Sequence, residues 1–153
     1  MRKRFLLCIA AAAAAALSAV PASASTDSPA SGTFTSLTVT ITSTRTAGGN
    51  TFVTANRTAA LTGTFTGTTT ETQTIVFQSD GTTIVHGQGT CACTVDGVSG
   101  TISYRIESSG TFPTSVSGQY VAQGSGGLAG LHAEGPFSGN FAVVTYGGQV
   151  HFS

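Results

Sequence analysis

The chain has 153 residues, the size of one domain, and only 8% of them are charged. Six basic side chains balance six acidic ones, and three of the basic ones lie at positions 2–4. The remainder of the chain has no basic patch to hold a phosphate backbone or an anionic membrane surface. Nucleic-acid binding and polybasic membrane contact are therefore disfavoured.

The N-terminus has the three parts of a secretory signal peptide. Basic residues precede an apolar run over residues 5–20, and Ala22 and Ala24 form a small-x-small cleavage site. The run is shorter than the ~20 residues that a membrane-spanning helix needs. We therefore predict that residues 1–24 form a signal helix outside the fold, that cleavage follows Ala24, and that the mature protein is secreted and free of the membrane.

The mature chain is expected to contain a short tail and one domain. Residues 25–32 are rich in Ser, Ala and Pro and are predicted to be disordered. Residues 33–153 form the predicted domain, and the mature chain has three basic residues (Arg45, Arg57 and Arg105) against six acidic ones. Its formal net charge is 3 − 6 = −3.

Within this domain, apolar and polar residues alternate, which is the pattern of half-buried strands. Leu37, Val39 and Ile41, for example, alternate with threonines. Segments rich in Gly, Asn, Asp or Ser separate the alternating runs, as expected of tight hairpins. We predict strands over residues 34–42, 61–66, 71–78, 82–95, 101–107, 115–123, 140–145 and 149–152.

Seven or eight antiparallel strands of this kind form either a sandwich or a closed up-and-down barrel. We favour the barrel, because glycines within the strands allow sharp coiling and closure removes edges that a chain poor in Lys could not guard. Gly87 and Gly89 are expected to mark a bulge or bend. The glycine-rich run 124–137 is expected to bend the backbone while Leu128, Leu131 and Phe137 reach the core.

An ordered series of turn sequences resembles the DUF3224 family. The segments are Leu61-Thr-Gly-Thr-Phe-Thr-Gly67, Asp80-Gly81, Thr94-Val-Asp-Gly-Val-Ser-Gly100, Ser109-Gly-Thr-Phe112, Gly124-Ser-Gly-Gly-Leu-Ala-Gly-Leu131, Glu134-Gly135 and Phe137. The resemblance covers residues 33–140 and implies an eight-stranded calycin-like barrel, similar to allene oxide cyclase and dirigent proteins, with no assigned reaction. The chain departs from the family at residues 107–110, where it lacks a histidine, and at Cys91 and Cys93.

Strand parity predicts an inner face that is almost entirely apolar. Its predicted members are Leu37, Val39, Ile41, Leu61, Phe65, Ile75, Phe77, Val85, Ile102, Ile106, Val116 and Phe141. The polar candidates on this face are Gln73, Tyr104 and Tyr120, with Glu71 at a rim. A small barrel either fills its lumen with side chains or holds one small ligand. These four residues are therefore the candidate ligand-binding groups.

No residue pattern predicts a cofactor or a metal. The glutamates at 71, 107 and 134 show no converging pair, and His86, His132 and His151 lack the spacing of zinc ligands. Three functions stay open: a binding module for a small apolar molecule, a cofactor-independent cyclase or isomerase using Glu71, Tyr104 and Tyr120 by analogy with allene oxide cyclase, and a non-enzymatic envelope or interaction protein. We favour binding over catalysis. A homo-oligomer is also possible.

Cys91 and Cys93 are the only cysteines of the mature chain and the natural pair in an oxidising compartment. In a regular strand the β-carbons of residues i and i+2 lie about 6–7 Å apart, whereas a disulfide needs roughly 3.5–4.5 Å. A bridge therefore needs a local distortion. Two buried thiols are the alternative, and we favour a strained, readily reduced bridge.

Overall fold

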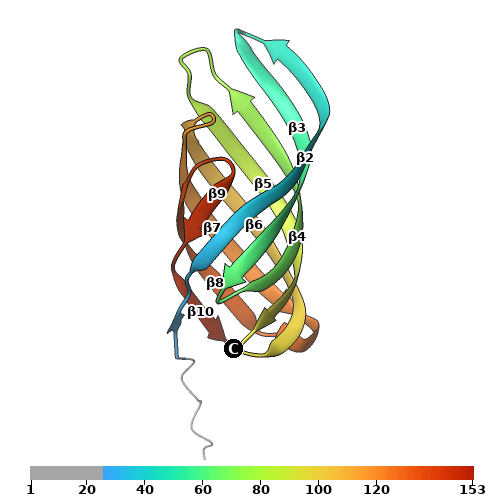
Figure 1. The fold of residues 1–153 in the computed structure, drawn as a ribbon, viewed down its shortest axis with the longest axis vertical. Coiled ribbons are helices and arrows are strands. Elements are labelled where there is room, and N and C mark those ends of the chain that lie inside the picture. The colour runs from blue at the N-terminus through green and yellow to red at the C-terminus, as the bar shows by residue number, and fades with distance from the viewer. Residues whose placement is uncertain (1–25) are drawn as a thin grey trace, which may run out of the picture.

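The computed structural model describes residues 26–153, which form an antiparallel all-β domain (Figure 1). The predicted signal peptide and its cleavage site lie outside the described residues. The strands are β1 (Ser28–Pro29), β2 (Gly32–Ala47), β3 (Asn50–Gly63), β4 (Thr66–Phe77), β5 (Thr83–Val95), β6 (Val98–Thr111), β7 (Ser115–Ser125), β8 (Leu131–Gly139), β9 (Val143–Tyr146) and β10 (Gln149–Phe152), with one 3-10 turn, η1 (Gly126–Leu128). Across these residues, no helix has the length and apolar character needed to cross a membrane.

Eight of the strands close into a ring. From β2 to β8 each strand pairs with the next along the chain, and β9 pairs with both β8 and β2. This seam is short, because β9 contacts β2 only through residues 32–35. β10 pairs with the remainder of the free edge of β8, and β1 pairs with β10. The predicted up-and-down, barrel-like fold is confirmed.

Local chemistry explains the regular hairpins of the ring. Asp96 and Gly97 connect β5 to β6, and both have positive φ, 49° and 80°. A two-residue hairpin turn needs this left-handed conformation, which Asp and Gly adopt at low cost. The two strands then pair in continuous register from Val95 and Val98 at the turn to Thr83 and Gly110 at the far end.

The inner face of β2 differs from the prediction. Leu37, Val39 and Ile41 are 58%, 56% and 63% exposed, so the predicted burial of this face was wrong. Val39 lies opposite Arg57 and Ile41 opposite Ala55, and both therefore do lie on the inner side of the sheet. They are exposed because β9 pairs with β2 only over residues 32–35 and does not reach the part of β2 that contains them. The rest of the predicted inner face is buried or half-buried.

Gly87 and Gly89 do not mark a bulge. β5 pairs with β4 and with β6 without interruption at these positions. The irregular positions lie instead between β2 and β3, at Ser36/Thr38 and Ile41/Ser43. The two glycines lie opposite Gln73 and Glu71 on the inner face, and their role is to leave space for side chains in the lumen.

Two further segments are more ordered than predicted. The glycine-rich run contains η1 and most of β8, a strand that the sequence analysis missed. Leu128 and Leu131 are 0% exposed and Phe137 is 8% exposed, so the predicted core contacts are confirmed. The tail was expected to be disordered, yet it contains β1, and Ala30 is 3% exposed. The backbone N–H of Ala30 donates to the Gly148 carbonyl at 2.9 Å, which fixes the tail against the end of the ring.

Candidate functional site

The ring encloses an inner cavity of about 90 Å³, measured for the centre of a water molecule. One water needs roughly 10–15 Å³ on this scale, so side chains do not fill the lumen completely. Most of the wall is apolar or aromatic, and the apolar lining includes Phe34, Leu61, Phe65, Val85, Ile102, Ile106, Val116, Ala122, Phe137, Phe141 and Val144. The cavity therefore has the character of a site for a small apolar molecule.

The lining also contains a buried ion pair. Arg57 on β3 and Glu71 on β4 lie directly opposite each other. Arg57 Nη2 donates to Glu71 Oε1 at 2.9 Å and to Oε2 at 3.0 Å, and the two side chains are 13% and 0% exposed. The guanidinium carbon also lies 4.5 Å above the Phe34 ring centroid. Burial makes this pairing essential, because an isolated charge in an apolar lumen is very costly.

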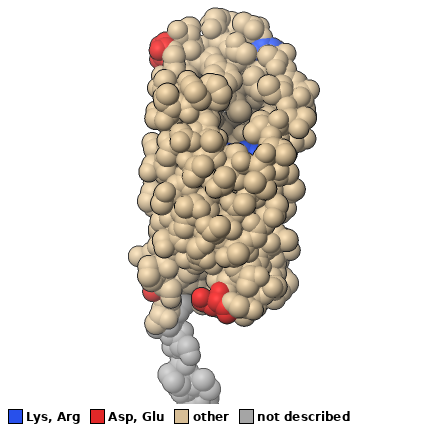
Figure 2. Space-filling view, viewed as in Figure 1, with Lys and Arg blue, Asp and Glu red and all other residues tan. Residues whose placement is uncertain are grey.

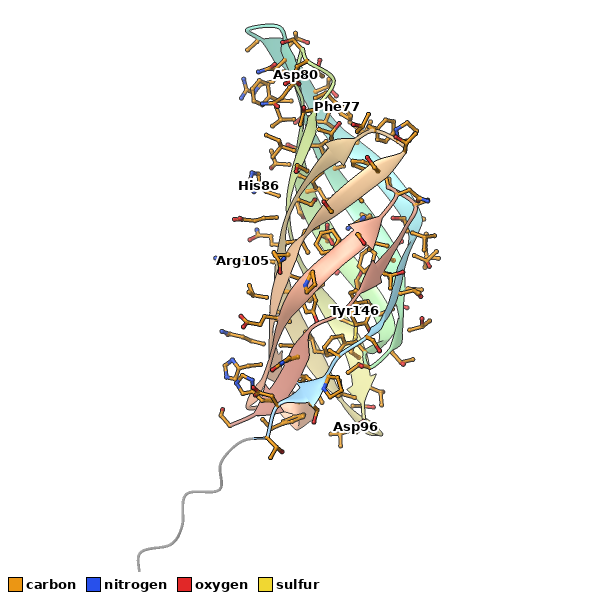
Figure 3. All side chains as sticks on the ribbon, turned by 90° about the vertical axis from the view of Figure 1, so that its left-hand side faces the viewer. Phe77, Asp80, His86, Asp96, Arg105 and Tyr146 are labelled. Carbon is orange, nitrogen blue, oxygen red and sulfur yellow. A yellow bond between two sulfur atoms is a disulfide. The ribbon has the colours of Figure 1, made fainter. Side chains whose placement is uncertain are left out.

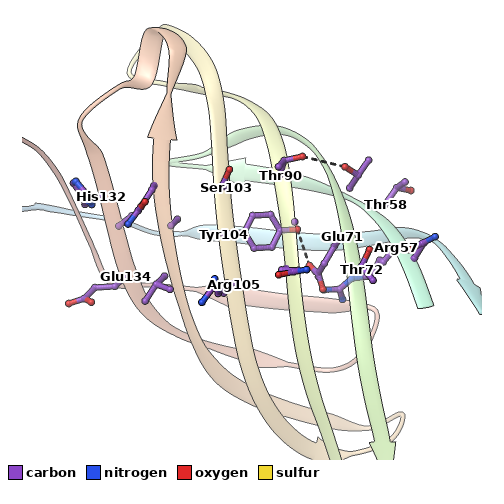
Figure 4. A pocket seen from close by; sticks show the side chains of 18 of the residues that line it. Arg57, Thr58, Glu71, Thr72, Thr90, Ser103, Tyr104, Arg105, His132 and Glu134 are labelled. Carbon is purple, nitrogen blue, oxygen red and sulfur yellow. Dashed lines mark hydrogen bonds and ion pairs between the residues drawn. The ribbon is translucent and has the colours of Figure 1, made fainter. Parts of the chain in front are cut away.

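Two neutral donors complete the shell of the Glu71 carboxylate. Gln73 Nε2 donates to Oε1 at 2.7 Å, and Tyr104 Oη donates to Oε2 at 2.9 Å. Figure 4 shows Tyr104 and Glu71 directed toward each other, whereas His132 and Glu134 lie apart on another strand. Two hydrogen bonds from Arg57 and two from the neutral donors fill the roughly four lone-pair sites of a carboxylate.

Glycines on β5 make room for this cluster. A β-carbon added at Gly87 would lie 2.5 Å from Glu71 Oε1, and one added at Gly89 would lie 2.7 Å from Tyr104 Oη. Both distances are shorter than van der Waals contact. The inward face of β5 is therefore free of side chains at the two positions where the carboxylate and the phenol approach it.

A second cluster in the lumen consists of two tyrosines and a phenylalanine. Tyr120 Oη donates to the Gly147 carbonyl at 2.9 Å, and Tyr146 Oη donates to the Thr62 carbonyl at 2.9 Å. Their rings pack around Phe65, with centroids 6.5 Å and 5.5 Å from its own. Both hydroxyls are thus bonded to the backbone, and the three rings form one part of the cavity wall.

The structure brings together three of the four predicted site residues. Glu71, Gln73 and Tyr104 form one cluster, whereas Tyr120 belongs to the aromatic group around Phe65. All four line the cavity. Glu71 was expected at a rim but is fully buried.

Arg57 is the site residue that the sequence analysis missed. The predicted second strand began at Leu61, whereas β3 begins at Asn50. Arg57 shares the parity of Ala59 and Leu61, so extending the alternation backwards would have placed it on the inner face.

The other candidate acid, base and metal-binding groups lie outside the lumen. His86 and Arg105 point away from the barrel (Figure 3), and Glu107 is exposed. His132 and His151 stack with ring centroids 5.3 Å apart. Within residues 26–153, no group of three or more His, Cys, Asp or Glu side chains has the arrangement of a metal site.

The lumen reaches the surface on one side. Figure 2 shows a hollow in the upper half of this face of the molecule, with a basic group at its edge. Arg57 lines the cavity and keeps 13% of its side chain exposed. Phe34 on β2 and Val144 on β9 pair across the short β2–β9 seam and both line the cavity, so the cavity lies directly beside the seam.

A broader depression, of about 1330 Å³ on the same scale, is open to solvent and follows the outer side of the sheet. Its lining is dominated by hydroxyl and amide side chains, most of them exposed, including Thr38, Thr40, Asn56, Thr58, Thr70, Thr72, Gln88, Thr90, Ser103 and Gln123. Several of these groups already bond to one another, as Thr72 does to Asn56 at 3.1 Å. The smaller inner cavity, with its converging polar groups, is the stronger candidate site.

Cys91 and Cys93 lie on the inner face of β5. Their sulfurs are bonded, their Cα atoms are 5.2 Å apart, and the residues are 0% and 2% exposed. This Cα separation is within the range of bridged cysteines. The bridge belongs to the wall of the lumen, since Cys91 also lines the cavity.

All three tyrosines of the chain are expected to ionise at higher pH in the folded protein than in the unfolded chain. Burial, aided by Glu71, raises the pKa of Tyr104 strongly, and burial raises the pKa of Tyr120 to about 12 and that of Tyr146 above its usual value of 10. The unfolded chain ionises first, so the associated stability is complete below pH 10 and decreases as the pH rises from there toward 12.

Ultraviolet titration of tyrosinate in native and guanidinium-unfolded protein measures this difference, and denaturant unfolding at each pH checks the loss of stability. A native titration that coincides with that of the unfolded protein would contradict the prediction.

These features define a class of protein: a single antiparallel β domain with an eight-stranded ring, an apolar lumen and a buried ion pair in its wall. No family model matches the chain, and no curated protein matches it. The resemblance to the DUF3224 family therefore stays a prediction.

Proposed function

We propose that this domain binds one small, predominantly apolar molecule inside its lumen. The observation that supports this is the inner cavity, whose apolar wall has a polar cluster at one place. Together with the predicted export, this makes the protein a secreted small-molecule binder. The opening beside the β2–β9 seam is the proposed entrance.

Arg57 is the proposed contact for a polar atom of the ligand. Its Nε–H has no hydrogen-bond partner within the part of the chain that the structure describes, and Nη1 reaches only Ser36 Oγ, at 3.4 Å. Glu71 already compensates the positive charge. A neutral acceptor such as a carbonyl or hydroxyl oxygen therefore suits this position better than an anion.

Catalysis by the Glu71 and Tyr104 pair is the less favoured alternative. A general base needs a free lone pair within reach of the substrate, whereas the Glu71 carboxylate already accepts four hydrogen bonds. The high pKa of Tyr104 also keeps its proton on the phenol. The arrangement favours a rigid wall over an acid–base pair.

Native mass spectrometry of protein purified from its own host tests the proposal directly. A bound small molecule of defined mass, released on denaturation, would support it. A barrel that is always empty and is unchanged by apolar additives would contradict it.

Filling the cavity is expected to weaken binding. Ala122 lines the cavity and is 7% exposed, whereas the adjacent Val121 points outward and is 52% exposed. We expect A122F to weaken binding of an environment-sensitive apolar dye at least about tenfold, a cost of roughly 1.4 kcal/mol. V121F is the matched control, with circular dichroism to verify the fold. Equal dye binding by the two variants would place the site elsewhere.

An envelope or interaction protein is the second candidate. The hydroxyl-rich outer depression favours it, because such a surface can hydrogen-bond to extended polar material. Co-sedimentation with cell-wall material distinguishes this candidate, since occupancy of the lumen does not affect the outer face.

A further inference from the structure

β2 extends well beyond the strand that closes the ring. β9 pairs with β2 over residues 32–35 only, and the Ser36 N–H then donates to the Ala142 carbonyl at 2.8 Å. From residue 37 to residue 47, β2 pairs with β3 on one side, and no strand in the described part of the chain pairs with its other side. Figure 1 shows β2 and β3 continuing past the end of β9.

This open edge lacks most of the features that protect sheet edges. Natural edges are guarded by Lys, Pro, short strands or bulges. Residues 37–44 contain no charge and no Pro. Two bulges flank the segment, but Thr38 to Ile41 pairs regularly with β3 between them. An exposed edge with this composition favours the addition of another strand.

The apolar side chains of the edge point to the same conclusion. Leu37, Val39 and Ile41 are each more than half exposed within a short distance of one another. Val39 and Ile41 lie on the inner side of the sheet, opposite Arg57 and Ala55. An added strand would bury part of this surface and extend the wall beside the opening of the lumen.

We propose that the partner is a second copy of this chain, paired antiparallel through β2 about a two-fold axis. An axis perpendicular to the sheet keeps the inner faces of both copies on the same side, so the apolar residues of one edge meet those of the other. Arg45, the one charge on β2, lies near the end of the strand, and antiparallel pairing keeps the two copies of it far apart. A neutral, alternating edge is therefore complementary to itself and offers nothing to a charged partner.

Sedimentation equilibrium of the mature protein tests this dimer. We expect a concentration-dependent mass of two chains, and I41K should raise the dissociation constant at least about tenfold, since like charges on paired edges repel. L37K is a second variant with the same expected effect. Because both side chains are largely exposed in the single chain, each variant is expected to fold.

Q88K is the matched control, since Gln88 is exposed on the outer face of β5 away from this edge. It adds the same charge and should leave the dimer intact. A wild-type protein that stays monomeric at all concentrations would overturn the proposal. A dimer that survives both I41K and L37K would do so as well, because it would use another surface.

Discussion

Replacing Arg57 by methionine is expected to destabilise the domain by about 3–5 kcal/mol, the usual cost of removing one partner from a buried ion pair. The Glu71 side chain is 0% exposed, and Arg57 supplies two of its four hydrogen bonds. Gln73 and Tyr104 can still donate, but neither carries a charge. Denaturant unfolding at neutral pH measures the change.

Two variants separate the lost charge from the lost side chain. R57M/E71L replaces the whole pair with apolar groups and should recover part of the stability, because the uncompensated charge is gone. The recovery is incomplete because Gln73 and Tyr104 lose their acceptor. R105M removes an exposed arginine and should change stability by no more than about 0.5 kcal/mol. If R57M costs as little as R105M, the ion pair is not the buried contact described here.

Truncating Leu131 to alanine is expected to cost about 2–5 kcal/mol, the range for buried Leu to Ala changes. Leu131 is 0% exposed and begins β8, beside the equally buried Leu128. The cost has two parts, the lost burial of the leucine and the cavity left behind, since the surrounding glycine-rich backbone has few side chains that could fill it. Thermal and denaturant unfolding give the magnitude.

Leu37 provides a matched control with the same chemical change. It is 58% exposed, so L37A should change stability by no more than about 0.5 kcal/mol. The stabilities of the two variants should be compared at low protein concentration, where pairing through the β2 edge does not contribute to stability. Equal losses for the two variants would contradict the burial assigned to these leucines.

The alternation of apolar and polar residues was sufficient to predict the direction in which most side chains point. Phe65, Val85, Ile102 and Val116 were predicted inward from alternation, and all are buried. The same pattern failed for Leu37, because alternation determines the side of the sheet to which a residue points and not whether another strand covers it. The missed strand β8 has an alternating run as well, but Gly135 and Pro136 interrupt it.

In the candidate site, too, the sequence predicted the direction of the side chains but not the contacts between them. Glu71, Gln73 and Tyr104 were predicted to face the lumen, and all three line the cavity. Their convergence on one carboxylate was not predictable, since it depends on the register between β4 and β6, strands that are not adjacent. Arg57 entered the site through a strand that began earlier than its apolar pattern indicated.

The sequence by itself determined the all-β class, the order of the hairpins and the apolar character of the lumen, because period-two alternation and turn residues act over a few neighbouring positions. Only the tertiary structure decided where the ring closes and what faces the cavity. The short β9 seam leaves one side of β2 unpaired from residue 37 to residue 47, beside the proposed entrance to the lumen. These features arise from pairings between residues as far apart as Gly32 and Tyr146, and such distant registers depend on the packing of the whole ring.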